Sequence, residues 1–184
     1  INLPSWDFSR DGKAWQQVAV PHDWAISGPF DKKWDLQMVA IEQNGETEKT
    51  EKSGRSGALP WIGEGMYKMN WTAPEGYKRA VLVFDGAMSQ PVVSVNGKEA
   101  GKWAYGYNAF RIDITPFIQF GKSNLIEVHL NNVEESSRWY PGGGLYRPVS
   151  VELYGNENFS TWDTFVRTLK ADKQEAEVEV NALL

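Results

Sequence analysis

The chain has no cysteine and only two histidines among its 184 residues. The lack of cysteine excludes disulfide bonds and thiol chemistry, leaves the redox compartment open and is compatible with export. His22 and His129 are far apart and have no further histidine or cysteine at metal-ligand spacing, so we expect neither a metal nor a cofactor. No apolar run approaches the ~18 residues that a membrane-spanning helix requires.

Positive charge is also in deficit. The chain has 19 Lys and Arg against 24 Asp and Glu, which gives a formal net charge of −5. Nucleic acids and anionic membranes attract basic surfaces, so we expect neither as a partner. Hydrophobic residues make up 41% of the chain and charged residues 23%, which is typical of a globular protein with one full core and a remnant.

Short strand-like segments dominate the middle of the chain. The run 80–85 is apolar up to Asp85, as in a strand buried on both faces. Asn96-Gly97 is a strong hairpin signal, because both residues tolerate positive φ. Alternating apolar and polar residues follow at 110–115, 125–131 and 149–153. Together these segments predict an all-β fold, a jelly-roll β-sandwich with little helix.

A segment rich in aromatic residues and glycine lies between two of these strands, at 136–147. Arg138 offers five N–H donors to hydroxyl oxygens, while Trp139 and Tyr140 offer flat apolar faces. The glycines at 142–144 let the backbone approach a ligand, but strand signals rather than a helix follow them, so a phosphate site is not expected. Two interpretations remain: a sugar-binding loop, or an aromatic loop packed on the β-core.

Six further short motifs lie before and after this loop in the sequence. They are Val-Pro-His-Asp-Trp at 20–24, Gly-Met-Tyr at 65–67, Val-Asn-Gly-Lys-Glu-Ala-Gly at 95–101, Phe-Arg-Ile-Asp-Ile-Thr at 110–115, Gly-Lys-Ser-Asn at 121–124 and Gly-Leu-Tyr-Arg-Pro-Val at 144–149. Their order and spacing resemble the amino-terminal sugar-binding domain of glycoside hydrolase family 2, which contains β-galactosidases, β-glucuronidases and β-mannosidases. The segment Ser-Arg-Trp-Tyr at 137–140 is most similar to the β-galactosidase branch.

The resemblance implies a substrate-binding role for Arg138, Trp139 and Tyr140, in a loop that helps to hold the sugar at the non-reducing end. Trp61 and Glu64, in the loop before the strand at residue 65, are further candidates. Some β-galactosidases have an aspartate, partly engaged with a cation, where this chain has Arg138. The guanidinium favours direct recognition of hydroxyl groups over a metal. Trp61 could instead plug the end of the sandwich.

The catalytic residues are expected to lie outside this chain. Glycoside hydrolysis requires two carboxyl groups, about 5 Å apart in a retaining enzyme, and the 24 acidic residues offer no unique pair. The Asn156-Glu157 dipeptide resembles the family's acid/base motif, but no apolar strand leads into it. The (β/α)₈ barrel that carries the family's chemistry needs about 250 residues. We therefore expect an inactive segment of a retaining exo-β-glycosidase, most similar to a β-galactosidase.

Two domains are expected, a sugar-binding jelly-roll at 1–155 and the start of an immunoglobulin-like sandwich at 156–184. In the second, alternating residues at 175–181 predict an amphipathic strand with no strand after it to pair with. The expected partners are a β-linked oligosaccharide or glycan, the other domains of the parent enzyme, and a second copy of the chain through this strand. Three alternatives remain: a free-standing carbohydrate-binding module, a family member of the β-glucuronidase or β-mannosidase type, and a scaffold that docks protein.

Overall fold

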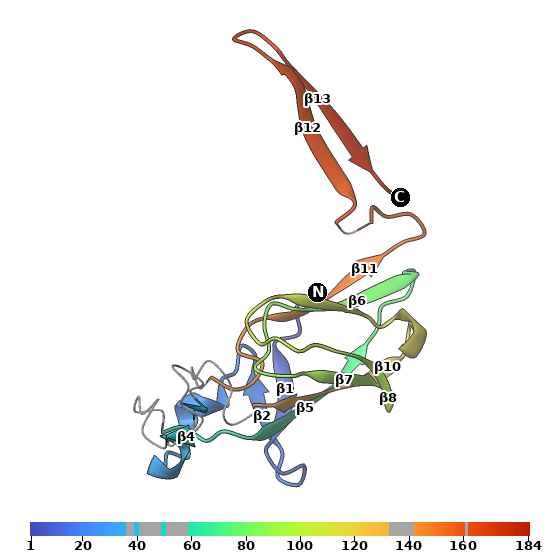
Figure 1. Cartoon of the computed structure of the whole chain (residues 1–184). Coiled ribbons are helices and arrows are strands. Elements are labelled where there is room, and N and C mark those ends of the chain that lie inside the picture. The colour runs from blue at the N-terminus through green and yellow to red at the C-terminus, as the bar shows by residue number, and fades with distance from the viewer. Residues whose placement is uncertain (36–38, 41–48, 51–58, 133–141, 161) are drawn as a thin grey trace.

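The computed structural model describes residues 1–35, 39–40, 49–50, 59–132, 142–160 and 162–184. Its architecture is a sandwich of two antiparallel sheets (Figure 1). In spatial order the larger sheet contains β2 (Gln16–Ala19), β1 (Ser5–Ser9), β5 (Glu64–Thr72), β10 (Ser123–Asn131), β7 (Val92–Val95) and β8 (Lys98–Lys102). The smaller sheet contains β11 (Val149–Tyr154), β6 (Arg79–Phe84) and β9 (Phe110–Asp113). The predicted all-β sandwich is confirmed.

Two small sheets and three 3₁₀ turns complete the described chain. The small sheets pair β3 (Val39–Ala40) with β4 (Lys49–Thr50) and β12 (Thr164–Ala171) with β13 (Ala176–Ala182). The 3₁₀ turns are η1 (Trp24–Ser27), η2 (Lys32–Asp35) and η3 (Thr115–Phe117). Within the described ranges, no helix has the length and apolar character needed to cross a membrane.

The core lies between the two main sheets. Every residue of β6 after Arg79 is buried, as the continuous apolar run predicts. In β10 the side chains alternate, so that Ile126, Val128 and Leu130 face the core while His129 lies on the outer face. The largest fully buried side chains, Trp6 and Trp24, fill the sandwich near β1 and η1.

The predicted hairpin turn is confirmed at Asn96 and Gly97, which have φ of 51° and 75°. The Asn96 side chain also accepts a hydrogen bond from Leu125 N (2.9 Å) and donates to the side chain of Asn124 (2.9 Å). Asn124 is fully buried and bonds in turn to the backbone of Gln119 at both N and O. The hairpin is therefore tied to the turn that precedes β10.

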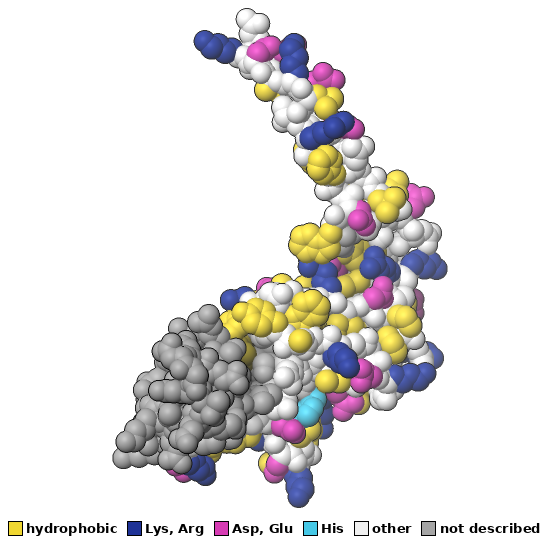
Figure 2. All heavy atoms as spheres, viewed as in Figure 1, with side chains coloured by type: hydrophobic (Ala, Val, Ile, Leu, Met, Phe, Trp, Pro, Cys, Tyr) yellow, Lys and Arg dark blue, Asp and Glu magenta, His cyan; other side chains and the backbone are white. Residues whose placement is uncertain are grey.

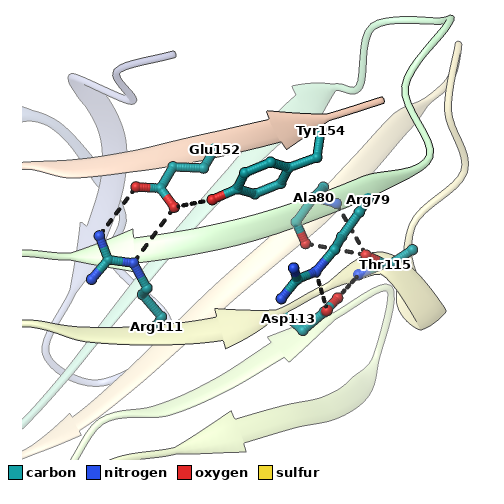
Figure 3. A network of polar contacts seen from close by, with 7 residues as sticks. All are labelled: Arg79, Ala80, Arg111, Asp113, Thr115, Glu152 and Tyr154. Atoms are coloured by element: carbon teal, nitrogen blue, oxygen red, sulfur yellow. Dashed lines mark hydrogen bonds and ion pairs between the residues drawn. The ribbon is translucent and has the colours of Figure 1, made fainter. Parts of the chain in front are cut away.

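The outer face of the smaller sheet carries a polar network (Figure 3). Arg111 of β9 reaches across β6 to Glu152 of β11, with 3.2 Å between Nη2 and Oε1. The Tyr154 hydroxyl donates to the same carboxylate (2.7 Å), and Arg79 pairs with Asp113 (2.9 Å). These are exposed ion pairs, which typically contribute about 0–1 kcal/mol each, so they fix the order of the strands more than they stabilise them.

The C-terminal strand corrects the expectation of an unpaired strand. It is β13, and it pairs with β12, the strand that precedes it in the chain. Val166 lies opposite Val180 and Thr168 opposite Val178 in an antiparallel hairpin. The hairpin extends away from the sandwich (Figure 1), and hydrophobic and charged side chains of both signs are exposed along it (Figure 2).

Candidate functional site

The residues that flank segment 133–141 form the base of the candidate site. Arg138, Trp139 and Tyr140 lie outside the described residues. The two ends of the segment are joined, because the Asn132 side chain donates to the Gly142 carbonyl (3.0 Å). The backbone N–H of Asn132 also donates a hydrogen bond to the Gly63 carbonyl (3.0 Å). Asn132, which precedes the segment, is therefore fixed to the residues just before β5.

Asp23 anchors the other end of the segment. One carboxylate oxygen, Oδ1, accepts hydrogen bonds from Ala25 N (2.8 Å) and Gly143 N (3.0 Å). It therefore caps η1 and at the same time holds the glycine run, residues 142–144. A second hydrogen bond joins the same two segments, because Trp24 N donates to the Gly143 carbonyl (2.9 Å). The carboxylate acts on backbone groups, which makes it a positioning group rather than a reacting one.

The Trp24 indole lies between two glycines and has no exposed surface. A Cβ at Gly143 would lie 2.2 Å from Trp24 Cε2, and a Cβ at Gly65 would lie 2.2 Å from Trp24 Cζ3. Both distances are far inside van der Waals contact, so neither position has room for a side chain. The indole N–H has no hydrogen-bond partner among the described residues. The ring thus sets the distance between β5 and the glycine run.

A pair of polar rings, half-buried His22 and buried Tyr67, supports the same corner. His22 Nδ1 and the Tyr67 hydroxyl are 2.7 Å apart, and His22 N donates to the Leu145 carbonyl (2.7 Å). Burial lowers the pKa of His22 and raises the pKa of Tyr67. A neutral imidazole can accept this hydrogen bond at Nδ1 when its own proton is on Nε2. These contacts join the residues around His22 to Tyr67 of β5 and to Leu145.

Trp61 and Glu64 have different surroundings. The Trp61 ring is half-buried and packs on Trp24, with 5.6 Å between ring centroids, while the Arg10 guanidinium lies 5.0 Å from its centroid. Those contacts match the plug at the end of the sandwich. Glu64 is exposed, and its carboxylate contacts His129 Nε2 at 3.1 Å. His129 lies in β10 and contacts no other charged side chain besides Glu64 among the ion pairs of the described residues. A sugar-binding role for Trp61 and Glu64 stays a prediction.

The described residues of this corner fix the positions that flank segment 133–141 but offer no cation site. No group of three or more His, Asp or Glu side chains gathers among the described residues in a way that could hold a metal ion. The anchoring roles of Asp23 and Asn132 were not predicted. Asp23 and Gly143 are separated by 120 positions, and the sequence signals were only that Asp23 lies in the motif at 20–24 and Gly143 among the glycines at 142–144.

Known proteins resemble the chain over most of its length. No family model matches it. A β-galactosidase of Bacteroides ovatus is 31% identical over 165 residues, which is 88% of this chain and 17% of that protein. A protein of Formosa agariphila described as a β-glucuronidase is 31% identical over 182 residues, which is 96% of this chain and 16% of that protein. The chain thus spans about a sixth of the length of these relatives.

A solved structure agrees with these relatives. The crystal structure of a glycosyl hydrolase family 2 member from Bacteroides cellulosilyticus superimposes with a TM-score of 0.77 and 28% identity, and the match covers 99% of this chain and 24% of that one. The match includes the sandwich and extends into the C-terminal hairpin. The order of motifs, the two-sheet fold and this coverage agree, and the chain belongs to glycoside hydrolase family 2.

Proposed function

We propose that the chain is the sugar-recognition domain of a larger retaining exo-β-glycosidase, with β-galactosides as its substrates. In this proposal segment 133–141 lines the substrate pocket, and Arg138, Trp139 and Tyr140 hold the sugar at the non-reducing end. The observation that carries the proposal is the anchored base, where Asn132 and Asp23 hold the two ends of the segment. Binding energy depends on such pre-organisation, because a free loop loses entropy when it is ordered by a ligand.

The side chains of the segment suit a galactose-like ring. The guanidinium of Arg138 can donate two parallel hydrogen bonds to neighbouring hydroxyl oxygens, and the rings of Trp139 and Tyr140 can pack on the C–H face of a pyranose. This domain needs no catalytic carboxylate, because both the acid and the nucleophile would come from a barrel elsewhere in the enzyme. The 184-residue chain is then inactive by itself.

Residues 156–184 fit the start of a second domain, of the immunoglobulin-like type. The hairpin β12–β13 has an apolar face that includes Val166, Val178 and Val180, each at least half exposed. A two-stranded hairpin is at best marginally stable alone, so further strands of the parent enzyme would cover this face.

The test is Arg138→Ala in the full-length glycosidase. A charged hydrogen bond to a buried ligand contributes about 1.5–3 kcal/mol, so kcat/KM for an aryl β-galactoside should fall roughly ten-fold to a hundred-fold. Arg79→Ala is the matched control, because it removes an exposed guanidinium on the outer face of the smaller sheet. An Arg138→Ala enzyme that melts at a lower temperature but keeps its kcat/KM would refute the role in sugar contact.

A second candidate activity is that of a β-glucuronidase, because relatives with the same 31% identity carry the two names. Comparing kcat/KM for aryl β-galactoside and aryl β-glucuronide separates the two. Calorimetric measurement of galactose binding to the isolated chain tests the alternative that it is a free-standing carbohydrate-binding module. A loop that only completes a pocket should give no measurable binding of galactose, whereas a module should bind it.

A further inference from the structure

Arg10 lies half-buried at one end of the sandwich, directly after β1. Its guanidinium lies over the Trp61 ring, 5.0 Å from the ring centroid, and its Nη2 donates a hydrogen bond to the Gly28 carbonyl. Its other N–H groups make no hydrogen bond within the part of the chain that the structure describes. Burial lowers the pKa of Arg10, but a guanidinium stays protonated at neutral pH, so the group keeps its positive charge.

Among the described residues no carboxylate pairs with this charge, and no ion pair includes Arg10. Asp11 is adjacent in the chain, but its Oδ1 accepts hydrogen bonds from the Ser9 hydroxyl (3.0 Å) and from two backbone N–H groups of the turn that follows. The Asp23 carboxylate is bound to the backbone of η1 and of the glycine run. A charge partly removed from water is costly without a partner, so this position favours an external anion.

A hollow of about 840 Å³ lies beside Arg10, between the β1–β2 hairpin and the end of η1. Residues 8–11 and 14–16 of the hairpin line it on one side, and residues 27–29 line it on the other. The volume is within the range of small-molecule sites. Of the described residues, those that anchor segment 133–141 do not line this hollow, which makes it a separate site.

Gln16 supplies a second polar group to the hollow. It lies opposite Phe8 in the pairing of β1 with β2, so both side chains extend from the same face of the hairpin. Arg10 lies on this side too, because Phe8 stacks on Trp24 and Trp24 packs against Trp61. An amide can both donate to and accept from hydroxyl groups. The hollow therefore combines one positive charge with a partner for neighbouring hydroxyls.

We propose that this hollow binds a sugar with a single carboxylate, a uronic acid residue, whose carboxylate contacts Arg10 while its ring hydroxyls contact Gln16. The planar fork of a guanidinium suits a carboxylate, to which it can donate two parallel hydrogen bonds. A phosphate monoester carries a charge of about −1.5 to −2 at pH 7. Arg10 is the one cation in the described lining, with the Asp11 carboxylate beside it, so a singly charged ligand fits better. The proposal does not depend on the role of Arg138.

The test is an NMR titration of the 184-residue chain with the sodium salt of methyl β-galacturonide. Methyl β-galactoside is the matched neutral sugar, because it has a hydroxymethyl group in place of the carboxylate. The Nε–H resonance that is lost in Arg10→Lys identifies Arg10. At constant ionic strength we expect this resonance to shift in a saturable manner with the acidic sugar and to stay in place with the neutral one. A resonance that does not move, or that moves equally with the neutral sugar or with sodium acetate, would overturn the proposal.

Variants measure the contribution of each contact, with the backbone amide of Gly28 as the reporter because Gly28 lines the hollow. Arg10→Gln should weaken binding of the galacturonide about ten-fold or more, and Gln16→Ala severalfold. Arg79→Gln removes an exposed guanidinium on the outer face of the smaller sheet and should bind normally. Arg138→Ala should also bind normally, which separates this site from the proposed sugar loop.

If Arg10→Gln does not fold, Arg10→Lys and Gln16→Ala carry the test. Lysine keeps the charge but lacks the planar fork, so Arg10→Lys should also bind severalfold more weakly. Unchanged affinity in both variants would refute the site, whether or not Arg138 acts in catalysis.

Discussion

Gly143→Ala is the most direct test of the anchored base. The added methyl would lie 2.2 Å from Cε2 and 2.3 Å from Nε1 of Trp24. Carbon atoms prefer separations of about 3.5 Å or more, so the ring or the glycine run must move by roughly 1 Å. Trp24 is fully buried, and overpacking of this kind costs about 1–3 kcal/mol. For a chain of this size the melting temperature should fall by about 2–12 °C.

The assay is thermal unfolding followed by circular dichroism, with two companion variants. Gly155→Ala is the matched control, because nothing lies within 4 Å of a Cβ at that position. Gly65→Ala meets the other side of the same ring, at 2.2 Å from Trp24 Cζ3, and should destabilise the fold similarly. If Gly143→Ala melts within about 1 °C of Gly155→Ala, Trp24 does not set the position of the glycine run and the reasoning is wrong.

Three further predictions concern single side chains. Asp23→Ala should lower the free energy of unfolding by about 1.5–3 kcal/mol in urea titrations, while Asp23→Asn, which keeps an acceptor, should recover most of it. Burial lowers the pKa of His22, so the unfolded chain binds a proton more readily, and stability should fall as pH drops from about 7 to 5. His22→Gln should flatten that dependence, and an equally steep decline in this variant would contradict it. Asn124→Ala should cost about 2 kcal/mol or more by the same urea assay, because it removes a fully buried amide that joins Asn96 to the backbone of Gln119 through hydrogen bonds; a loss below about 0.5 kcal/mol would contradict this.

Much of the sandwich could be predicted from local pattern. The apolar run of β6 predicts a strand buried on both faces, and the alternation of β10 predicts a strand buried on one face. Asn96-Gly97 predicts a turn that needs positive φ. The partner of β13 was missed because Phe165 and Val166 are adjacent apolar residues in β12, and a bulge at 168–170 interrupts the alternation there.

The anchoring contacts could not be predicted in the same way. The bonds from Asp23 to Gly143 and from His22 to Tyr67 join residues 120 and 45 positions apart, and no periodicity records such pairs. For Trp61 the difficulty is different, because the sequence predicts two roles and does not distinguish them. Its residue type suits both sugar stacking and packing, and only the surroundings, Trp24 and Arg10, distinguish a plug from an exposed platform.

The position of Trp24 between Gly65 and Gly143 also restricts how this chain can change by mutation. Each glycine excludes a side chain because of the same ring, so a substitution at either position becomes tolerable only after the indole is replaced by something smaller. Trp24→Phe would then act as a permissive change, with Gly143→Ala less harmful in its presence than alone. Related sequences should therefore vary at these three positions together, with a smaller ring at position 24 wherever position 65 or 143 carries a side chain.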